Sequence, residues 1–235
     1  MVRVMHTRLW LTCELLLLFV ALPVVLWQLQ LKGILFVLLW AGAGCCLVYL
    51  LLSKRFTRRR LWNARRAWAA MPRIVIRFLL LSALLTGVLY LVIPPVPMGE
   101  MPTTREGLRE LGPYAWTWFG LMRWNPNLYG FIMILYPIFS VLPQNIIYRV
   151  FFFHRYRLLL GSGWRMVLVS AGAFGLGHLM FGNWVAPVLC AIGGVIMADT
   201  YRRTRSAAAS WFEHSLFGDF VWTLGIGRLF YYNPG

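Results

Sequence analysis

The sequence is poor in acidic residues and in cysteine. Only 7 of its 235 residues are Asp or Glu, only 13% are charged, and there are 4 cysteines. Soluble domains carry about 25% charged residues, and small disulfide scaffolds are dense in cysteine. These shortages exclude a soluble globular domain and a disulfide scaffold. Because 60% of the residues are hydrophobic and the mean hydropathy is +0.67, the sequence predicts a polytopic membrane protein.

Basic residues outnumber acidic ones by 23 to 7, which gives a formal net charge of +16. In a soluble protein this excess would suggest a nucleic-acid partner. Here the basic residues gather in short segments between apolar runs, where the positive-inside rule explains them, so no nucleic-acid partner is expected. The segments at 54–73, 155–165 and 202–205 agree on one topology, in which all three face the cytoplasm.

Several apolar runs approach the length of about 20 residues that a helix needs to cross a bilayer. We therefore predict an all-α fold, a polytopic transmembrane helix bundle with about seven to eight membrane helices. The expected spans are 9–29, 33–52, 74–93, 127–153, 166–181, 184–198, 207–224 and a short eighth that reaches residue 232.

Composition divides the chain into three parts. Residues 1–95 hold N-terminal transmembrane helices with almost no internal polar groups, and 96–126 form an outer loop. The Pro-rich start and aromatic end of this loop predict a helix that lies in the membrane interface. Residues 127–235 carry most of the polar groups at membrane depth. Such groups are costly there and usually face a cavity or one another, so any chemistry is expected in this last part.

A polar stripe interrupts the expected span at 127–153. Asn145 and Arg149 are four residues apart and share a helix face, with Gln144 and Tyr148 on the adjoining strip. A functional interpretation places this stripe in a site within the membrane. The structural alternative is that Arg149 extends to the lipid headgroups and anchors the end of the helix.

Two histidines lie in separate later spans. His178 closes the segment 174–178, and His214 follows Glu213 in the last long span. Taken alone, either could merely bond a neighbouring helix. Together with the polar stripe they could form one site in the membrane, where imidazoles bind a metal or activate water. The spacing is not that of an HExxH zinc motif, so a divalent metal such as zinc, held by His178 and His214, stays an open possibility.

In their order along the chain, these segments resemble the CPBP (Abi) family of intramembrane proteases, which is related to the type II CAAX prenyl endopeptidases. That family is defined by EExxxR, FxxxH and HxxxN/D motifs on successive membrane helices. Here FxxxH is intact from Phe174 to His178, the arginine of the first motif is Arg149, and His214 begins the third. The resemblance covers about residues 143–232 and suggests the bacterial branch of the family.

The resemblance implies that a first-motif glutamate activates water while the histidines and a third-motif polar residue bind water or steady the oxyanion. Both glutamates are replaced, by Gln144 and Asn145, and Gly218 stands at the third-motif polar position. A carboxamide cannot accept a proton near neutral pH. The replacement is consistent with a natural pseudoprotease, with a deliberate inactivating substitution, or with a branch that uses another base.

The candidate site therefore has five main members and three auxiliary ones. The catalytic candidates are His178, His214, Asn145, Gln144 and Arg149, and the auxiliary candidates are Glu213, Asp219 and Asn183. The resemblance implies an intramembrane endopeptidase that hydrolyses a membrane-associated peptide or protein with activated water. The alternative is a non-catalytic pseudoprotease or binding scaffold for a hydrophobic or lipidated peptide. In either case the expected location is the bacterial inner membrane, in contact with lipid.

Overall fold

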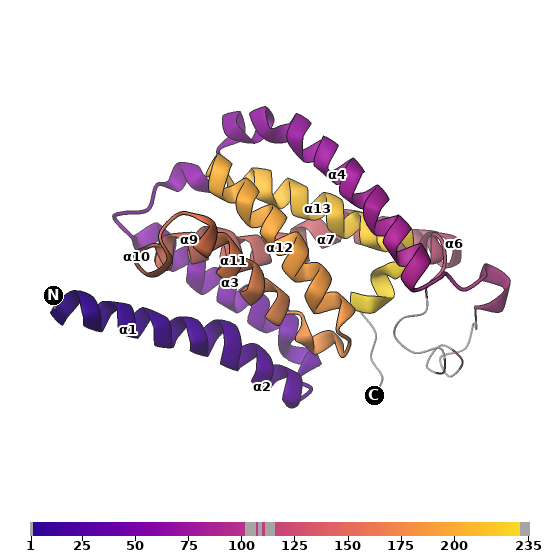
Figure 1. Cartoon of the computed structure of the whole chain (residues 1–235), viewed down its shortest axis with the longest axis horizontal. Coiled ribbons are helices and arrows are strands. Elements are labelled where there is room, and N and C mark those ends of the chain that lie inside the picture. The colour runs from indigo at the N-terminus through magenta and orange to yellow at the C-terminus, as the bar shows by residue number, and fades with distance from the viewer. Residues whose placement is uncertain (1, 102–106, 108–109, 111–115, 231–235) are drawn as a thin grey trace.

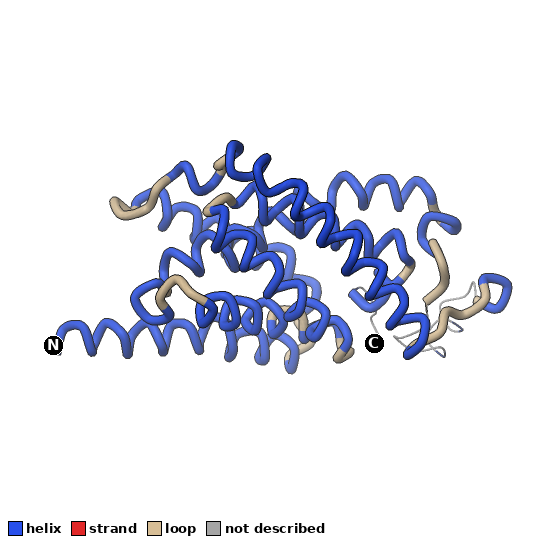
Figure 2. Tube along the Cα trace, turned by 45° about the horizontal axis from the view of Figure 1, so that its top comes forward, coloured by secondary structure: helices blue, strands red, loops and turns tan. Residues whose placement is uncertain are grey.

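The structure, a computed structural model, describes residues 2–101, 107, 110 and 116–230. These residues form helices joined by short loops, and none of them forms a β-strand. The predicted all-α class is therefore confirmed. Figures 1 and 2 show most of the long helices running lengthwise or obliquely along the long axis of the molecule.

The helices of the N-terminal part come first in the chain. They are α1 (Val2–Leu16), which continues through a π-turn (Leu17–Ala21) into α2 (Leu22–Gln28), then α3 (Leu35–Leu52) and α4 (Ala64–Val92). Short 3₁₀ helices lie at Lys32–Ile34, Arg58–Leu61 and Met98–Glu100.

The second half begins with α6 (Gly120–Trp124) and one long, uneven helix. That helix consists of α7 (Pro126–Tyr136), a π-turn (Pro137–Val141), α8 (Leu142–Asn145), a second π-turn (Ile146–Phe151) and α9 (Phe152–Arg155). Then come α10 (Arg157–Leu160), α11 (Trp164–Leu176), α12 (Val185–Thr204) and α13 (Ala207–Leu224), with 3₁₀ helices at Leu179–Phe181 and Ile226–Phe230.

Six helical stretches in the described residues are long and apolar enough to cross a membrane. They are Thr7–Gln28, Leu35–Leu52, Arg58–Val92, Pro126–Arg155, Trp164–Phe181 and Val185–Thr204. These stretches support the predicted polytopic helix bundle, and the count of seven to eight membrane helices stays a prediction. Residues 207–224 do form a helix, α13, but its polar side chains leave it outside these six. The short eighth span is a 3₁₀ helix over Ile226–Phe230, and its predicted end at residue 232 lies outside the described residues.

The basic segment 54–73 is not a loop throughout, because α4 already begins at Ala64. Part of the outer loop at 96–126 lies outside the described residues. Its described part includes the short helix α6, and residues 116–119 before it are not helical. Instead Trp116 is buried against Leu224 and Leu229, and its indole donates a 2.6 Å hydrogen bond to the Ile93 carbonyl. This loop therefore packs on the end of α13.

The helices are arranged around α12 and α13. Figure 1 shows α4 along one side of this pair, across α13, and α1 and α2 on the opposite side of the molecule. The outer helices expose many large apolar side chains, among them Leu52 and Leu91, which are 78% and 81% exposed. An apolar surface of this kind is what lipid requires. The molecule is an integral membrane protein.

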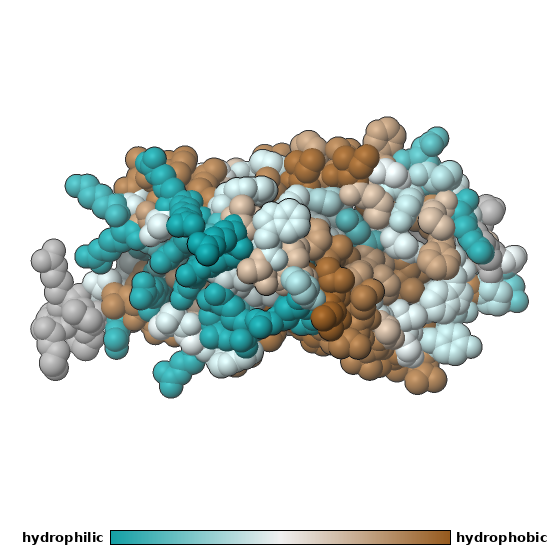
Figure 3. All heavy atoms as spheres, turned by 90° about the horizontal axis from the view of Figure 1, so that it is seen from above, coloured by the Kyte–Doolittle hydropathy of each residue, from teal (hydrophilic) through white to brown (hydrophobic). Residues whose placement is uncertain are grey.

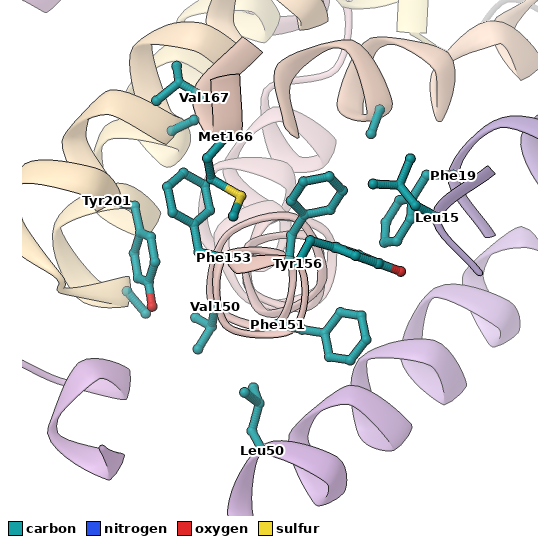
Figure 4. Packing of buried hydrophobic residues seen from close by; sticks show 14 of the residues in the cluster. Leu15, Phe19, Leu50, Val150, Phe151, Phe153, Tyr156, Met166, Val167 and Tyr201 are labelled. Carbon is teal, nitrogen blue, oxygen red and sulfur yellow. The ribbon is translucent and has the colours of Figure 1, made fainter. Parts of the chain in front are cut away.

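The long helix α7–α9 carries the main core at its end. Figure 4 shows Val150, Phe151, Phe153 and Tyr156 projecting from it in different directions, toward neighbouring helices that supply Leu50, Phe19 and Tyr201. Such burial on all sides fixes the position of this helix against α1, α3 and α11. It therefore also fixes the polar residues one to two turns earlier in the same helix.

Small residues allow α11 and α12 to approach closely. A Cβ atom on Gly175 would lie 2.8 Å from the Pro187 carbonyl oxygen, and one on Gly194 would lie 3.0 Å from Ala171 Cα. Close approach through small residues is typical of helix pairs in membranes. It brings the segment that ends in His178 directly against α12.

Candidate functional site

Asn145 links α8 to the start of α13. Its side chain is 2% exposed. The amide Nδ2 donates to the Ala207 carbonyl at 2.8 Å, and Oδ1 accepts a 2.9 Å hydrogen bond from Ser210 Oγ. Both ends of the amide are therefore used. Ser210 lies one turn before His214, so Asn145 sits close to the helix that carries this histidine.

Arg149 lies deep inside the protein. Its side chain is 1% exposed, and Nη1 donates to Ser170 Oγ at 2.9 Å and to the Tyr148 carbonyl at 3.2 Å. The guanidinium carbon lies 4.9 Å from the centroid of the Phe174 ring. The alternative that Arg149 anchors the helix at the headgroups is wrong, because a buried guanidinium cannot reach them.

Both histidines pack on the ring of Phe174. The ring centroid of His178 lies 4.6 Å from that of Phe174, and the centroid of His214 lies 5.3 Å from it, both with edge-to-face geometry. Arg149 contacts the same ring. Phe174 is the first residue of the FxxxH segment. It therefore gathers the three charged or titratable candidates from three separate helices.

The tautomer of His178 follows from one hydrogen bond. Its Nδ1 lies 2.7 Å from the Phe174 carbonyl oxygen. A carbonyl can only accept, so Nδ1 carries the proton and donates it. In the neutral ring Nε2 is then a free acceptor. His178 is positioned by the end of α11, where the helix stops and the 3₁₀ helix over Leu179–Phe181 begins.

Gln144 and two of the auxiliary candidates offer unused acceptors. Gln144 Nε2 donates to Ser140 Oγ at 3.0 Å. Its Oε1, Glu213 Oε2 and Asp219 Oδ1 are buried and have no hydrogen-bond partner among the described residues. An unsatisfied buried acceptor costs about 1–3 kcal/mol. Such atoms are available to a donor on a bound ligand.

Glu213 is held by a residue that the sequence analysis overlooked. Its carboxylate is fully buried, and Oε1 accepts a 3.0 Å hydrogen bond from Arg77 Nε and a second, closer one from Nη2. Arg77 also donates to Thr200 Oγ1. The prediction that residues 1–95 have almost no internal polar groups fails at Arg77. A charge inside the apolar run 74–93 was the signal that could have found it.

Asn183 has a structural role. Its Nδ2 donates to the Leu229 carbonyl at 2.7 Å, and its Oδ1 accepts from the Ala186 backbone N–H at 2.9 Å. These bonds tie the first turn of α12 to the 3₁₀ helix near the C-terminus. The side chain has no remaining group directed at either histidine.

Tyr136 fills the space at the third-motif position. A Cβ atom added to Gly218 would collide with the Tyr136 ring and hydroxyl. A polar side chain at Gly218 has no room, and a phenol group stands where it would project. Sequence spacing could not have shown this, because Tyr136 lies 82 residues earlier on α7.

The described residues do not form a metal-binding cluster around the histidines. Among the described residues, no group of three or more His, Cys, Asp or Glu side chains is placed to hold a metal ion. Catalytic zinc sites use three protein ligands, so the residues present do not fit a zinc centre.

Part of the second half of the chain resembles a known protein family. Residues 126–218 match the family model described as Type II CAAX prenyl endopeptidase Rce1-like. This segment is similar to that family, and the match supports the resemblance to the CPBP (Abi) proteases. Comparisons with curated proteins and with solved structures gave no match. The matched region includes Asn145, Arg149, His178 and His214.

Proposed function

We propose that this protein is an intramembrane endopeptidase of the CAAX type, whose hydrolysis is slow because the first-motif glutamates are replaced. The observation that carries the proposal is the convergence of Arg149, His178 and His214 on the Phe174 ring. These residues lie inside the matched domain. A membrane-embedded cationic group beside two imidazoles is suited to stabilising a developing oxyanion.

His178 is the proton acceptor in this proposal. With Nδ1–H donated to the Phe174 carbonyl, Nε2 accepts a proton from water as the water oxygen adds to the peptide carbonyl carbon. The tetrahedral intermediate then expels the amine as the C–N bond breaks, and the proton on Nε2 passes to that amine. A positioned general base contributes about 10²- to 10⁴-fold.

The remaining groups stabilise the oxyanion or hold neighbouring helices together. Arg149 supplies positive charge near the reacting carbonyl, and the Tyr136 hydroxyl replaces the third-motif polar side chain as a donor. Asn145 offers no proton acceptor, since both ends of its amide bind α13. In this proposal, the loss of a carboxylate at residue 145 makes hydrolysis slow.

The substrate we propose is a membrane-associated peptide or protein. The polar residues lie among helices with lipid-facing outer surfaces, so a soluble peptide would meet an apolar barrier. We also propose that the basic segments face the cytoplasm of a bacterial inner membrane, as the positive-inside rule requires. A nucleic-acid partner has no part in this function.

Restoring the carboxylate tests the proposal. The parent, Asn145→Glu and Asn145→Gln are purified, placed in liposomes and incubated with farnesylated and unmodified peptides that end in a C-a-a-X sequence. Mass spectrometry then measures release of the C-terminal tripeptide. Asn145→Glu should cleave at least about 100-fold faster than the parent. Asn145→Gln has the same length without the carboxylate and should not gain activity.

Absence of cleavage by Asn145→Glu would contradict the proposal. If Asn145→Glu folds as the parent does and releases no fragment from either class of peptide, hydrolysis is not the function of this site. Binding of the same peptides without cleavage would then identify a non-catalytic scaffold.

A further inference from the structure

Five arginines line one cavity at the end of the molecule where α4 begins. The cavity has a volume of about 560 Å³ and is lined by Thr57, Arg59, Arg60, Asn63, Arg65, Arg66, Ala69 and Arg205. We call it the basic cavity. Its walls come from the 3₁₀ helix over Arg58–Leu61, the first turns of α4 and the residue that ends α12. Of the described residues that line it, none is acidic.

No described carboxylate balances the charges in the basic cavity. None of its five arginines forms an ion pair with a described carboxylate. The nearest acid in sequence to Arg205, Asp199, is bound by Arg202 and Arg203 instead. Burial and the neighbouring Arg60 guanidinium both lower the pKa of Arg205. Like charges held this close repel one another, and a bound anion would relieve the repulsion.

The backbone holds these arginines together although they repel. Arg205 adopts a left-handed conformation (φ 51°) that ends α12, and its N–H donates to the Tyr201 carbonyl at 2.8 Å. Arg66 Nη1 reaches the Thr204 carbonyl at 3.5 Å, which ties α4 to the same end of α12. The convergence is therefore built into the fold. It is more than a run of basic residues in sequence, which the positive-inside rule alone would explain.

A second cavity lies further along α4, beside the apolar part of the helix. It has a volume of about 530 Å³ and is lined by Arg73, Ile76, Arg77, Leu80 and Leu81. The two cavities lie on one face of α4. Successive lining residues are spaced by four, three and four positions, which is the spacing of a single helix face: Ala69 in the basic cavity, then Arg73, Ile76 and Leu80 in the second cavity. Together they cover a length of about 16 Å.

We propose that this face of α4 binds an anionic phospholipid, with the phosphate in the basic cavity and an acyl chain along the second cavity. Guanidinium groups match phosphate oxygens in charge and geometry. Clusters of four to eight basic residues beside a membrane helix are typical of anionic lipid sites. Figure 3 shows the corresponding surface, with hydrophilic side chains gathered where α4 begins and hydrophobic ones over the middle of the molecule. The apolar continuation favours a lipid over a free phosphate ion.

Native mass spectrometry of the full chain in detergent tests the site with three probes: phosphatidylglycerol, phosphatidylcholine and inorganic phosphate. The variant Arg60→Gln/Arg205→Gln removes two charges from the basic cavity. Arg55→Gln/Arg58→Gln removes two charges from the same segment outside the cavity and serves as the matched control. The first variant should bind phosphatidylglycerol about 30-fold more weakly than the parent, and the control should bind within about threefold of it.

The acyl-chain half has its own pair of variants. Leu80 lines the second cavity, whereas its neighbour Leu79 does not, and both are exposed (67% and 60%). Leu80→Gln should weaken phosphatidylglycerol binding more than Leu79→Gln does. Phosphatidylcholine should bind at least about tenfold more weakly than phosphatidylglycerol, and millimolar inorganic phosphate should not displace the lipid.

Three results would overturn the proposal. Equal loss of binding in Arg60→Gln/Arg205→Gln and in the control pair would reduce the site to general surface charge. Equal binding of the two lipids would remove the role of net charge. Displacement of phosphatidylglycerol by inorganic phosphate would identify a site for a soluble anion. A melting temperature measured for each variant without added lipid ensures that a misfolded protein is not counted as a loss of binding.

Discussion

Arg77 on α4 donates two hydrogen bonds to a single oxygen of Glu213 on α13. Nε lies 3.0 Å from Oε1, Nη2 contacts the same atom, and Glu213 Oε2 has no partner among the described residues. The carboxylate is fully buried, while 24% of the Arg77 side chain is exposed. This pair joins the outer helix α4 to the helix that carries His214.

Breaking this pair from one side should destabilise the protein. Arg77→Met leaves the Glu213 carboxylate buried without a cation, and loss of one partner of a buried pair costs about 3 kcal/mol or more. The double variant Arg77→Met/Glu213→Leu removes both charges and should recover most of the loss. Thermal unfolding in detergent measures both. A double variant as unstable as Arg77→Met would show that the pair is not what holds α4 in place.

The variant Glu213→Gln distinguishes a structural role of Glu213 from a catalytic one. Because Glu213 Oε1 is held by Arg77, we expect Glu213→Gln to lower stability while the cleavage rate of the otherwise unchanged protein falls less than about threefold. If Glu213 supplied the base, the fall should reach about 10²-fold or more. Initial rates of tripeptide release, normalised to folded protein, distinguish the two roles.

His178 should be essential to cleavage, and another histidine provides a matched control. In the parent protein, His178→Ala removes the free Nε2 acceptor and should reduce the rate by about 10²-fold or more. His154 lies on α9, where its Nε2 is paired with Ser53 Oγ at 3.0 Å and its ring packs on Phe56. His154→Ala should leave the rate within about threefold. Equal effects of the two substitutions would contradict the role given to His178.

The helical class and the main polar residues of the site could be predicted from the sequence. Long apolar runs decide the class because the bilayer leaves few alternatives, and polar residues inside such runs draw attention because they are costly there. This reasoning correctly singled out Asn145 and Arg149 as interior residues. It also predicted the helix α13, whose polar groups keep it outside the six stretches that are apolar enough to cross a membrane by composition.

The partners of these residues could not be predicted from sequence. Ser170 and Ser210 are ordinary small residues in a membrane helix, and only the packing of helices shows that they bind Arg149 and Asn145. The position of Tyr136 against Gly218 depends on how α7 crosses α13. Spacing along one helix reveals a shared face, whereas contacts between helices depend on packing that a single sequence does not display.

Loss of the Ser170 hydroxyl should destabilise the protein more than loss of another buried serine hydroxyl. Its Oγ accepts from Arg149 Nη1 and donates to the Tyr148 carbonyl at 2.7 Å. Ser170→Ala leaves a buried guanidinium with one fewer acceptor, which should cost about 1.5–3 kcal/mol. Ser215→Ala removes only a hydroxyl bonded to the Trp211 carbonyl of its own helix, so about 1 kcal/mol or less is expected. A similar fall in melting temperature for both variants would argue against a special role for Ser170.

Gly218 and Tyr136 should be coupled, because one occupies the space that the other leaves. Gly218→Asn places a side chain into the Tyr136 ring and should destabilise the fold by about 1–3 kcal/mol or more through overpacking. Tyr136→Ala alone creates a cavity and should cost about 3 kcal/mol. The double variant Gly218→Asn/Tyr136→Ala should be more stable than the sum of the two single effects predicts, by at least about 1 kcal/mol. Additive losses would mean that the two positions do not share this space.

The Tyr136 hydroxyl has a test of its own. In the Asn145→Glu background, Tyr136→Phe keeps the ring and removes the hydroxyl. If that hydroxyl is the oxyanion donor, the cleavage rate should fall while the melting temperature stays the same.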